Sequence, residues 1–218
     1  MKTWQWIAAG MAAWVFLRPK SARAASMGAG GTSIVPSGDR SGNAAVLTAA
    51  RSIPDGGTYK ISGTGVPFDV VHKQVVILPK GDTVYCSGFT FATAVRAAQQ
   101  RGLLENKSVQ QVRQFQKDWY GAGGESEQLS GPALQKLGIG APVSQDEAMP
   151  GDFLQLWRTS SSGHSVVFLD WLRDAKGNKI GVKYRSAQGA KGVSDNQERF
   201  SDSGGSVLRS RIYFSRLA

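Results

Sequence analysis

The chain has few of the residues that build metal sites and covalent crosslinks. Its 218 residues include one cysteine, Cys86, and two histidines, His72 and His164. A single cysteine cannot form an internal disulfide. One thiol and two well-separated imidazoles match no zinc-ligand spacing, and neither a His-Glu-x-x-His motif nor a Gly-rich phosphate loop is found. The sequence therefore indicates no metal and no cofactor, and it leaves a free thiol to be explained.

The chain also lacks an apolar run of the roughly 20 residues that cross a bilayer as a helix. Its best candidate, Trp4 to Leu17, is about 14 residues long and lies between Lys2 and the small-residue site Ala22-Arg23-Ala24. This order is typical of a secretory signal. We interpret residues 1–25 as a signal peptide; an uncleaved membrane anchor is the alternative, because basic residues follow the apolar stretch. Both interpretations predict export, so the protein is expected to be secreted or periplasmic.

Charge narrows the range of partners. Without the four basic residues of the leader, 22 basic and 16 acidic residues remain, a net charge of +6. A moderately basic balance favours anionic polymers such as cell-wall or envelope material. No Lys/Arg run interleaved with aromatic residues is present, which argues against nucleic acid. Membrane contact is expected only through an uncleaved N-terminal segment.

The rest of the chain divides into a linker and one domain. Residues 26–42 are rich in Gly, Ser and Ala and have no hydrophobic period, so they are predicted to be a flexible linker. Residues 43–218 are long enough for one core, and they contain no internal repeat. Apolar spacing predicts helices over residues 44–52, with Asn43 as the N-cap, and over residues 87–100, 108–119 and 126–137.

Strand patterns dominate the C-terminal part. A β-branched run over residues 74–78 predicts a strand or hairpin before the cysteine. After Pro150-Gly151, strands are predicted over residues 152–157, 164–172, 179–185 and 207–214, with Gly177-Asn178 as a hairpin turn. Helices followed by antiparallel strands predict an α+β fold with helices packed on one face of a sheet. The helix that starts at the cysteine is expected to be the central one.

Cys86 lies where an extended segment meets a predicted helix. A helix start has unpaired N–H groups and a partial positive charge, and both favour the thiolate, which is the reactive form of cysteine. A lone cysteine is more often a small buried apolar residue than a nucleophile. The position of Cys86 alone therefore does not decide between a structural and a catalytic role.

His164 is the candidate base for this thiol. It begins a predicted strand, within Gly163-His164-Ser165-Val166-Val167, where an imidazole can meet the helix start and exchange a proton with the sulfur. The next strand offers Gln188 or Ser186 as the polar group that orients the ring. His72, within a predicted hairpin insertion, is the competing base.

Taken in order, these pieces resemble the NlpC-type cell-wall peptidases, a bacterial branch of the papain-like cysteine peptidases close to the cysteine- and histidine-dependent amidohydrolases. Four segments from about residue 43 onward carry the resemblance: residues 44–51 with Gly57-Thr58-Tyr59, Cys86-Ser87-Gly88-Phe89, Pro150-Gly151-Asp152-Phe153-Leu154 and residues 163–167. The chain departs from the family in having Tyr85 where Asp is usual, and in placing Tyr59 27 residues before Cys86.

The resemblance implies a papain-like fold and hydrolysis of amide bonds in peptidoglycan stem peptides. It implies Cys86 as nucleophile, His164 as base, Gln188 or Ser186 as the orienting residue, and Tyr59 as a donor to the oxyanion beside the backbone N–H of Cys86. The chemistry requires no cofactor. Two alternatives stay open: an inactive module of the same fold that binds wall peptides, and a peptidoglycan-degrading toxin delivered to rival cells.

Overall fold

The structure is a computed structural model of the chain, and it describes residues 42–61, 65–121 and 127–218. The predicted signal peptide, residues 1–25, lies outside these residues, as does the predicted linker except for Gly42, which is the first residue of a helix. Within the described ranges, no helix is long and apolar enough to cross a membrane.

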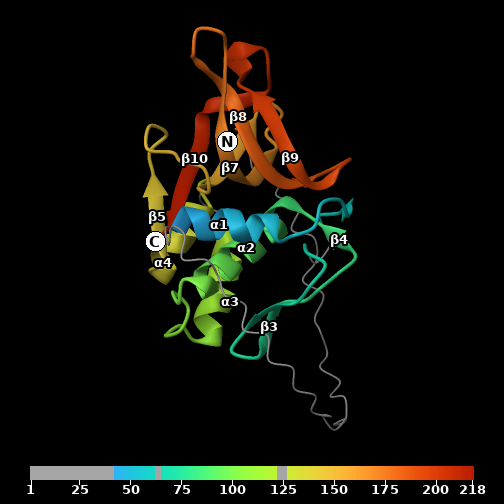
Figure 1. Ribbon diagram of the computed structural model, residues 1–218, viewed down its shortest axis with the longest axis vertical. Helices are drawn as coiled ribbons and strands as arrows, with labels where there is room; N and C mark the ends of the chain where they lie inside the picture. The colour runs from blue at the N-terminus through green and yellow to red at the C-terminus, as the bar shows by residue number, and fades with distance from the viewer. Residues whose placement is uncertain (1–41, 62–64, 122–126) are drawn as a thin grey trace, which may run out of the picture. The chain divides into compact units, whose positions relative to one another are not determined.

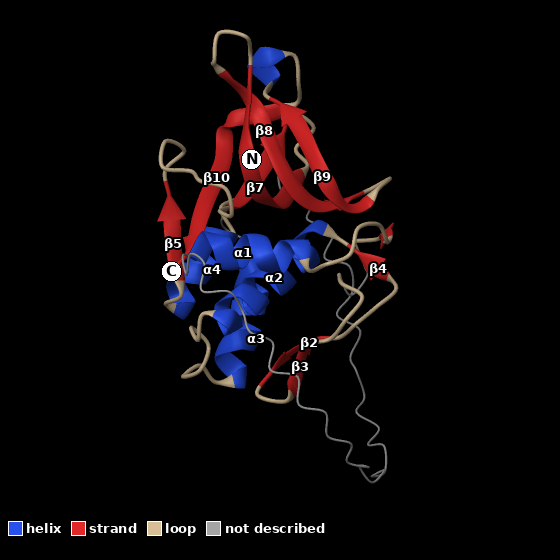
Figure 2. Cartoon of the chain, viewed as in Figure 1, coloured by secondary structure: helices blue, strands red, loops and turns tan. Residues whose placement is uncertain are grey.

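The α-helices precede the strands of the main sheet along the described chain (Figures 1 and 2). The α-helices in the described ranges are α1 (Gly42–Arg51), α2 (Cys86–Gln100), α3 (Val109–Trp119) and α4 (Ser130–Leu137). Ser108 caps α3: its hydroxyl accepts from Gln111 N, and the Gln111 side chain accepts from Ser108 N. Gly138 ends α4 in the left-handed conformation. The four predicted helices are confirmed, with shifted boundaries.

Two details of the helix prediction were wrong. Asn43 is the second residue of α1 and does not cap it; its amide instead donates to Pro150 O at 3.0 Å and to Asp152 Oδ1 at 2.9 Å. Helix α4 begins at Ser130, four residues after the predicted start at Ser126, which lies outside the described residues. Asn43 was interpreted as a cap although its bonding partners are remote in sequence.

The main sheet is antiparallel, with the strand order β5-β10-β6-β7-β8-β9. Its strands are β5 (Gly140–Val143), β6 (Phe153–Arg158), β7 (Gly163–Arg173), β8 (Lys179–Gln188), β9 (Gly192–Arg199) and β10 (Val207–Leu217). The four strands predicted after Pro150-Gly151 are confirmed as β6, β7, β8 and β10. Strands β5 and β9 were not predicted, because β5 is short and β9 after Val193 contains only polar and charged residues.

The helices lie on one side of this sheet, which confirms the α+β class (Figure 2). Helix α2 contacts α1 and α3 as well as strands β7 and β8, so it is the central helix, as predicted (Figure 1). Phe89, Phe91 and Val95 of α2 are buried in a core that Phe153 and Val167 of the sheet complete. Burial of this apolar surface fixes α2 against the sheet.

The other side of the sheet encloses a second core. Leu156, Val166, Tyr184 and Phe214, from four different strands, pack together there with Phe200, which precedes a short 3-10 helix, η1 (Ser201–Ser203). Since all of these residues come from the sheet and its connections, the sheet curls around them. The central strands β6 and β7 thus bury both of their faces over most of their length.

Two small sheets join the end of α1 to the start of α2. Strands β1 (Thr58–Tyr59) and β4 (Thr83–Val84) pair in parallel, with Tyr59 opposite Val84. Between them, β2 (Val70–His72) and β3 (Val75–Leu78) form a hairpin, which confirms the hairpin predicted before the cysteine. The hairpin extends away from the main sheet (Figure 1).

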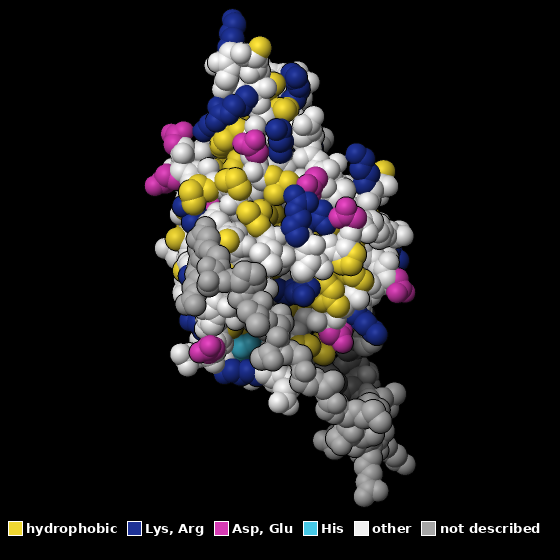
Figure 3. All heavy atoms as spheres, viewed as in Figure 1, with side chains coloured by type: hydrophobic (Ala, Val, Ile, Leu, Met, Phe, Trp, Pro, Cys, Tyr) yellow, Lys and Arg dark blue, Asp and Glu magenta, His cyan; other side chains and the backbone are white. Residues whose placement is uncertain are grey.

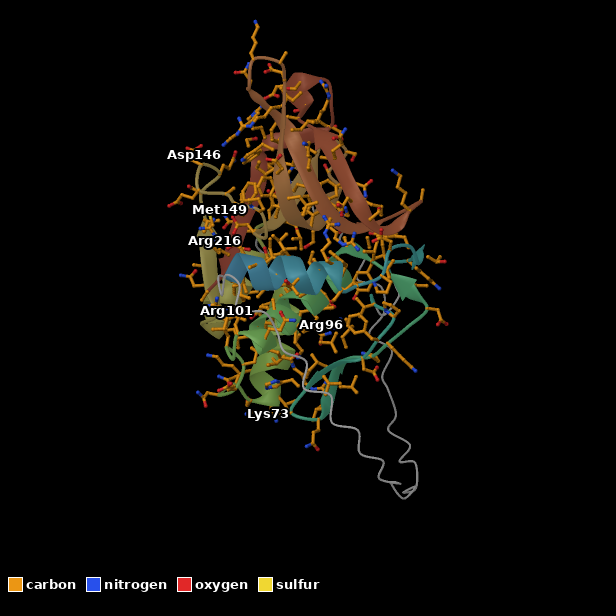
Figure 4. All side chains as sticks on the ribbon, in the orientation of Figure 1. Lys73, Arg96, Arg101, Asp146, Met149 and Arg216 are labelled. Atoms are coloured by element: carbon orange, nitrogen blue, oxygen red, sulfur yellow. The ribbon has the colours of Figure 1, made fainter. Side chains whose placement is uncertain are left out.

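Asp152 of the Pro-Gly-Asp segment anchors one corner of the sheet. Its carboxylate is fully buried and accepts from Arg216 Nε at 2.7 Å, from Arg216 Nη2 at 2.8 Å and from Met149 N at 2.7 Å, besides the Asn43 amide. Figure 4 labels Met149 and Arg216 at this corner. The cluster ties α1 to β10 and to the turn before β6.

Replacement of Asp152 by Ala is expected to lower the free energy of unfolding by about 3 kcal/mol, because it leaves the Arg216 guanidinium and the Asn43 amide without their acceptor. Urea denaturation measures this change. The control is Asp202→Ala, which breaks an exposed pair with Arg209 and is expected to leave the denaturation midpoint almost unchanged. Equal effects of the two substitutions would contradict the anchoring role of Asp152.

Candidate active site

Cys86 is the first residue of α2. Tyr85 before it is extended, and no side chain caps the helix start, so the first-turn N–H groups remain available to a ligand. The third residue is Gly88 because the chain passes very close there: a Cβ on Gly88 would lie 2.6 Å from the Cα of Gly65. The half-buried thiol therefore lies at the positive end of a 15-residue helix.

A chain of hydrogen bonds holds this helix start against strand β7. The hydroxyls of Thr90 and Ser165 are 2.9 Å apart, and Trp119 Nε1 donates to Thr90 Oγ1 at 3.1 Å. Ser165 is the residue after His164, and its backbone N–H donates to the sulfur of Cys86. The contact thus brings the start of β7, and with it His164, to the thiol.

The surroundings of the sulfur favour its ionised form. Burial raises the pKa of the Cys86 thiol, but the hydrogen bond and the charge of the His164 ring, with further hydrogen bonds from Ser165 N and Tyr59, outweigh it. The net result is a pKa lowered to about 6. A large fraction of this cysteine is therefore thiolate at neutral pH, whereas a free cysteine with a pKa of about 8.5 is mostly thiol.

Gln188 is the side chain that contacts the far nitrogen of the His164 ring. Gln188 Nε2 and His164 Nε2 are 2.8 Å apart. An imidazolium donates from both nitrogens, so an amide turned to present Oε1 at this position accepts the Nε2 proton. Since Nε2 faces Gln188, Nδ1 is the nitrogen left for proton exchange with the thiol.

Ser186, the alternative orienting residue, does not contact the ring. It is fully buried, and its hydroxyl donates to the backbone oxygen of Ser165 at 2.7 Å. Ser186 therefore supports the strand next to the thiol, while Gln188 takes the place beside the imidazole.

Tyr59 reaches the thiol through the parallel pairing of β1 and β4. This pairing sets Tyr59 opposite Val84, two residues before Cys86, and lets the intervening segment with its hairpin loop outward. The hydroxyl donates to Cys86 Sγ at 3.7 Å, and the backbone N–H of Cys86 donates to the same hydroxyl oxygen. Burial, and next the negative charge of the sulfur, raise the pKa of Tyr59, so its hydroxyl stays protonated.

His72, the competing base, does not take part. It is buried in β2, and its Nε2 lies 2.8 Å from Lys107 O, to which it donates. The groups that shift the pKa of Cys86 include His164 and not His72. In the described part of the chain, no group of three or more His, Cys, Asp or Glu residues is arranged to hold a metal ion.

Sequence reasoning missed three kinds of contribution to this site. Ser165 acts through its backbone N–H, which leaves no signal in residue type. Tyr184 contacts the imidazole edge-on, with ring centroids 5.5 Å apart. Glu198 accepts a hydrogen bond from Tyr184, and it was missed because its strand, β9, is almost entirely polar and charged.

Comparison of the chain with protein-family models, with curated proteins and with solved structures found no match. The site is therefore defined by its own geometry. Four of the five candidate residues, Cys86, His164, Gln188 and Tyr59, come together from four elements of the chain. Nucleophilic catalysis by a thiol requires such a grouping, with a base, an orienting group and an oxyanion donor beside the sulfur.

The alkylation rate of Cys86 by iodoacetamide is expected to rise through a midpoint near pH 6, because the rate follows the thiolate fraction and the pKa of the thiol is lowered to about 6. In His164→Ala the hydrogen bond and the charge of the ring are lost while burial remains. The midpoint should then move up to the ordinary value of about 8.5 or beyond. A wild-type midpoint near the ordinary value would show that the imidazole does not activate the thiol.

Proposed function

We propose that the protein is a cysteine amidase or endopeptidase with a papain-like arrangement, which hydrolyses amide bonds through an acyl-enzyme. The observation that carries the proposal is the Cys86 sulfur at the start of α2, in contact with the His164 ring and with the Tyr59 hydroxyl. A buried structural thiol has no need of an imidazole, and burial alone would raise its pKa.

The first half of the reaction forms the acyl-enzyme. The Cys86 thiolate attacks the amide carbon, a C–S bond forms, and the carbonyl oxygen becomes an oxyanion. The backbone N–H of Cys86 and the hydroxyl of Tyr59 lie side by side at the sulfur, and both donate to that oxyanion. The protonated His164 ring gives its proton to the leaving nitrogen as the C–N bond breaks.

The second half releases the acid. The now neutral His164 takes a proton from water, the hydroxide adds to the thioester carbon, and the C–S bond breaks. The thiolate and the imidazolium are then restored. Gln188 accepts from Nε2 of the ring throughout, so that Nδ1 stays directed at the sulfur and the substrate.

We propose amide bonds of peptidoglycan stem peptides as the substrate. The resemblance of the cysteine, Pro-Gly-Asp and Gly-His segments to cell-wall peptidases supports this choice, and so do the predicted export and the basic net charge. Lys and Arg side chains are scattered among acidic ones over the face shown in Figure 3, rather than gathered in one patch. This distribution suits weak attraction to an anionic wall polymer better than tight binding of a polyanion.

Cys86→Ala and His164→Ala are each expected to abolish release of peptide fragments from purified sacculi, because one removes the nucleophile and the other the proton carrier. Mass spectrometry of the soluble products measures the release and identifies the bond cut. The matched control is His72→Gln, which keeps a side-chain N–H for Lys107 O and should retain wild-type turnover.

Circular dichroism and thermal denaturation check that the variants are folded. Undiminished fragment release by folded Cys86→Ala would rule out the nucleophile and the proposed function with it. Wild-type protein that binds sacculi but releases nothing would favour the binding module instead.

Tyr59→Phe is expected to lower kcat by about 10²-fold with little change in KM, because the phenol donates to charge that develops only in the transition state. Steady-state kinetics on a soluble stem-peptide fragment measures the two constants. An unchanged kcat would mean that the oxyanion relies on backbone N–H groups alone.

A further inference from the structure

A polar layer lies behind the His164 ring, and the chemistry above does not use it. Tyr184 of β8, Glu198 of β9 and Arg158 of β6 meet there. The Tyr184 hydroxyl donates to Glu198 Oε1 at 2.5 Å. Arg158 donates two hydrogen bonds to the same carboxylate, from Nε to Oε2 at 2.7 Å and from Nη2 to Oε1 at 2.6 Å.

A buried charged pair such as Arg158 and Glu198 is weak evidence of a role in stability. The side chains of Arg158 and Glu198 are only 21% and 20% exposed, and Tyr184 is 1% exposed. Desolvation at such depth cancels much of the attraction within an ion pair, so apolar residues of similar size would serve the core equally well. A role at the adjacent site accounts better for a charged pair here.

The layer contacts both groups that control the thiol. Tyr184 packs against the His164 ring at an interplanar angle of 77°, with the ring centroids 5.5 Å apart. The Gln188 amide, which contacts Nε2 of His164, also hydrogen-bonds the Tyr184 hydroxyl. Because Tyr184 donates its one proton to Glu198, the position of this hydroxyl depends on the carboxylate.

The carboxylate also acts on the ring through its charge. Burial raises the pKa of Glu198, but hydrogen bonds from Arg158 and Tyr184, together with the charges of Arg158 and of the His164 ring, lower it below its ordinary value. Glu198 is therefore ionised at neutral pH. The Glu198 carboxylate and the His164 ring therefore attract each other.

We propose that Glu198, held by Arg158, is a positioning residue of the candidate active site: it fixes Tyr184, and through Tyr184 it fixes the His164 ring and the Gln188 amide. The inference rests on the proposed function of the thiol–imidazole pair. Glu198 itself touches neither the sulfur nor the scissile bond, so it acts only through these neighbours and through its charge.

Charged and titratable groups surround the Cys86–His164 pair on several sides. They are Tyr85 next to Cys86, Tyr120 after α3, Tyr59 of β1, Tyr184 of β8, Glu198 of β9 and Arg158 of β6. Glu198 is the acidic residue of this set, and it also neutralises Arg158. Its loss therefore removes an attraction for the imidazolium and leaves a repulsion uncompensated.

The test uses Glu198→Gln, which keeps the shape and removes the charge, and Tyr184→Phe, which keeps the ring and removes the hydroxyl. Each is expected to lower kcat about tenfold while KM stays within about twofold. In Glu198→Gln the midpoint of Cys86 alkylation should also rise, because a ring that is no longer held in place loses the hydrogen bond to the sulfur that lowers the pKa of the thiol.

The chain provides matched controls in a second trio of the same residue types. Glu127 accepts from Arg211 Nε at 2.9 Å and from the Tyr213 hydroxyl at 3.1 Å, and no contact joins it to His164 within the described residues. Glu127→Gln and Tyr213→Phe should therefore keep the wild-type kcat and pH profile. Thermal denaturation of all four variants separates loss of folding from loss of function.

The alkylation measurement needs no substrate, so it separates failure of this inference from failure of the proposed function. A wild-type thiol without reactivity near pH 6 would overturn the proposed function itself. The positioning role would be overturned if the thiol of Glu198→Gln reacted near pH 6 as fully as the wild-type thiol. It would also be overturned if Glu127→Gln lost as much activity as Glu198→Gln. If Glu198→Gln does not fold, the kcat of Tyr184→Phe tests the proposal instead, and an unchanged kcat in that variant overturns it.

Discussion

The contact between the start of helix α2 and the start of strand β7 is the constraint on which the site depends. The paired hydroxyls of Thr90 and Ser165, 2.9 Å apart, and the Trp119 indole behind them set the distance between helix and strand. With this distance fixed, the backbone N–H of Ser165 reaches the sulfur, and the neighbouring His164 ring lies at the helix start. The geometry at the thiol thus depends on contacts between buried residues that are mostly uncharged.

A second constraint holds the tyrosine in place. Arg185 of β8 is buried and donates to the backbone oxygens of Ala50 and Ile53 and to Asp55 Oδ1, at 3.1, 2.9 and 2.5 Å. It thereby fixes the segment that leads from α1 into β1. Strand β1 then pairs with β4 and delivers Tyr59 to the helix start, although 27 residues separate Tyr59 from Cys86 in sequence. The segment inserted between β1 and β4 needs only to begin and end at these two paired strands.

The sequence predicted the helix at the cysteine and the strand at His164, because apolar residues recur there at helical and strand spacing. It did not distinguish Gln188 from Ser186: both lie on one strand two residues apart, and only the register with β7 shows which one meets the ring. Glu198 was missed because β9 presents no apolar run. Such partners depend on strand pairing between remote segments, which local periodicity does not encode.

The central claim is that Cys86 and His164 share one crevice, and crosslinking tests it most directly. A dihaloacetone alkylates a thiolate first and can then bridge only to a nucleophile within a few ångströms. Peptide mapping by mass spectrometry should find the Cys86 peptide joined to the His164 peptide, and His164→Ala should leave the Cys86 adduct unbridged. A bridge to His72, or an unbridged adduct in the wild-type protein, would contradict the account.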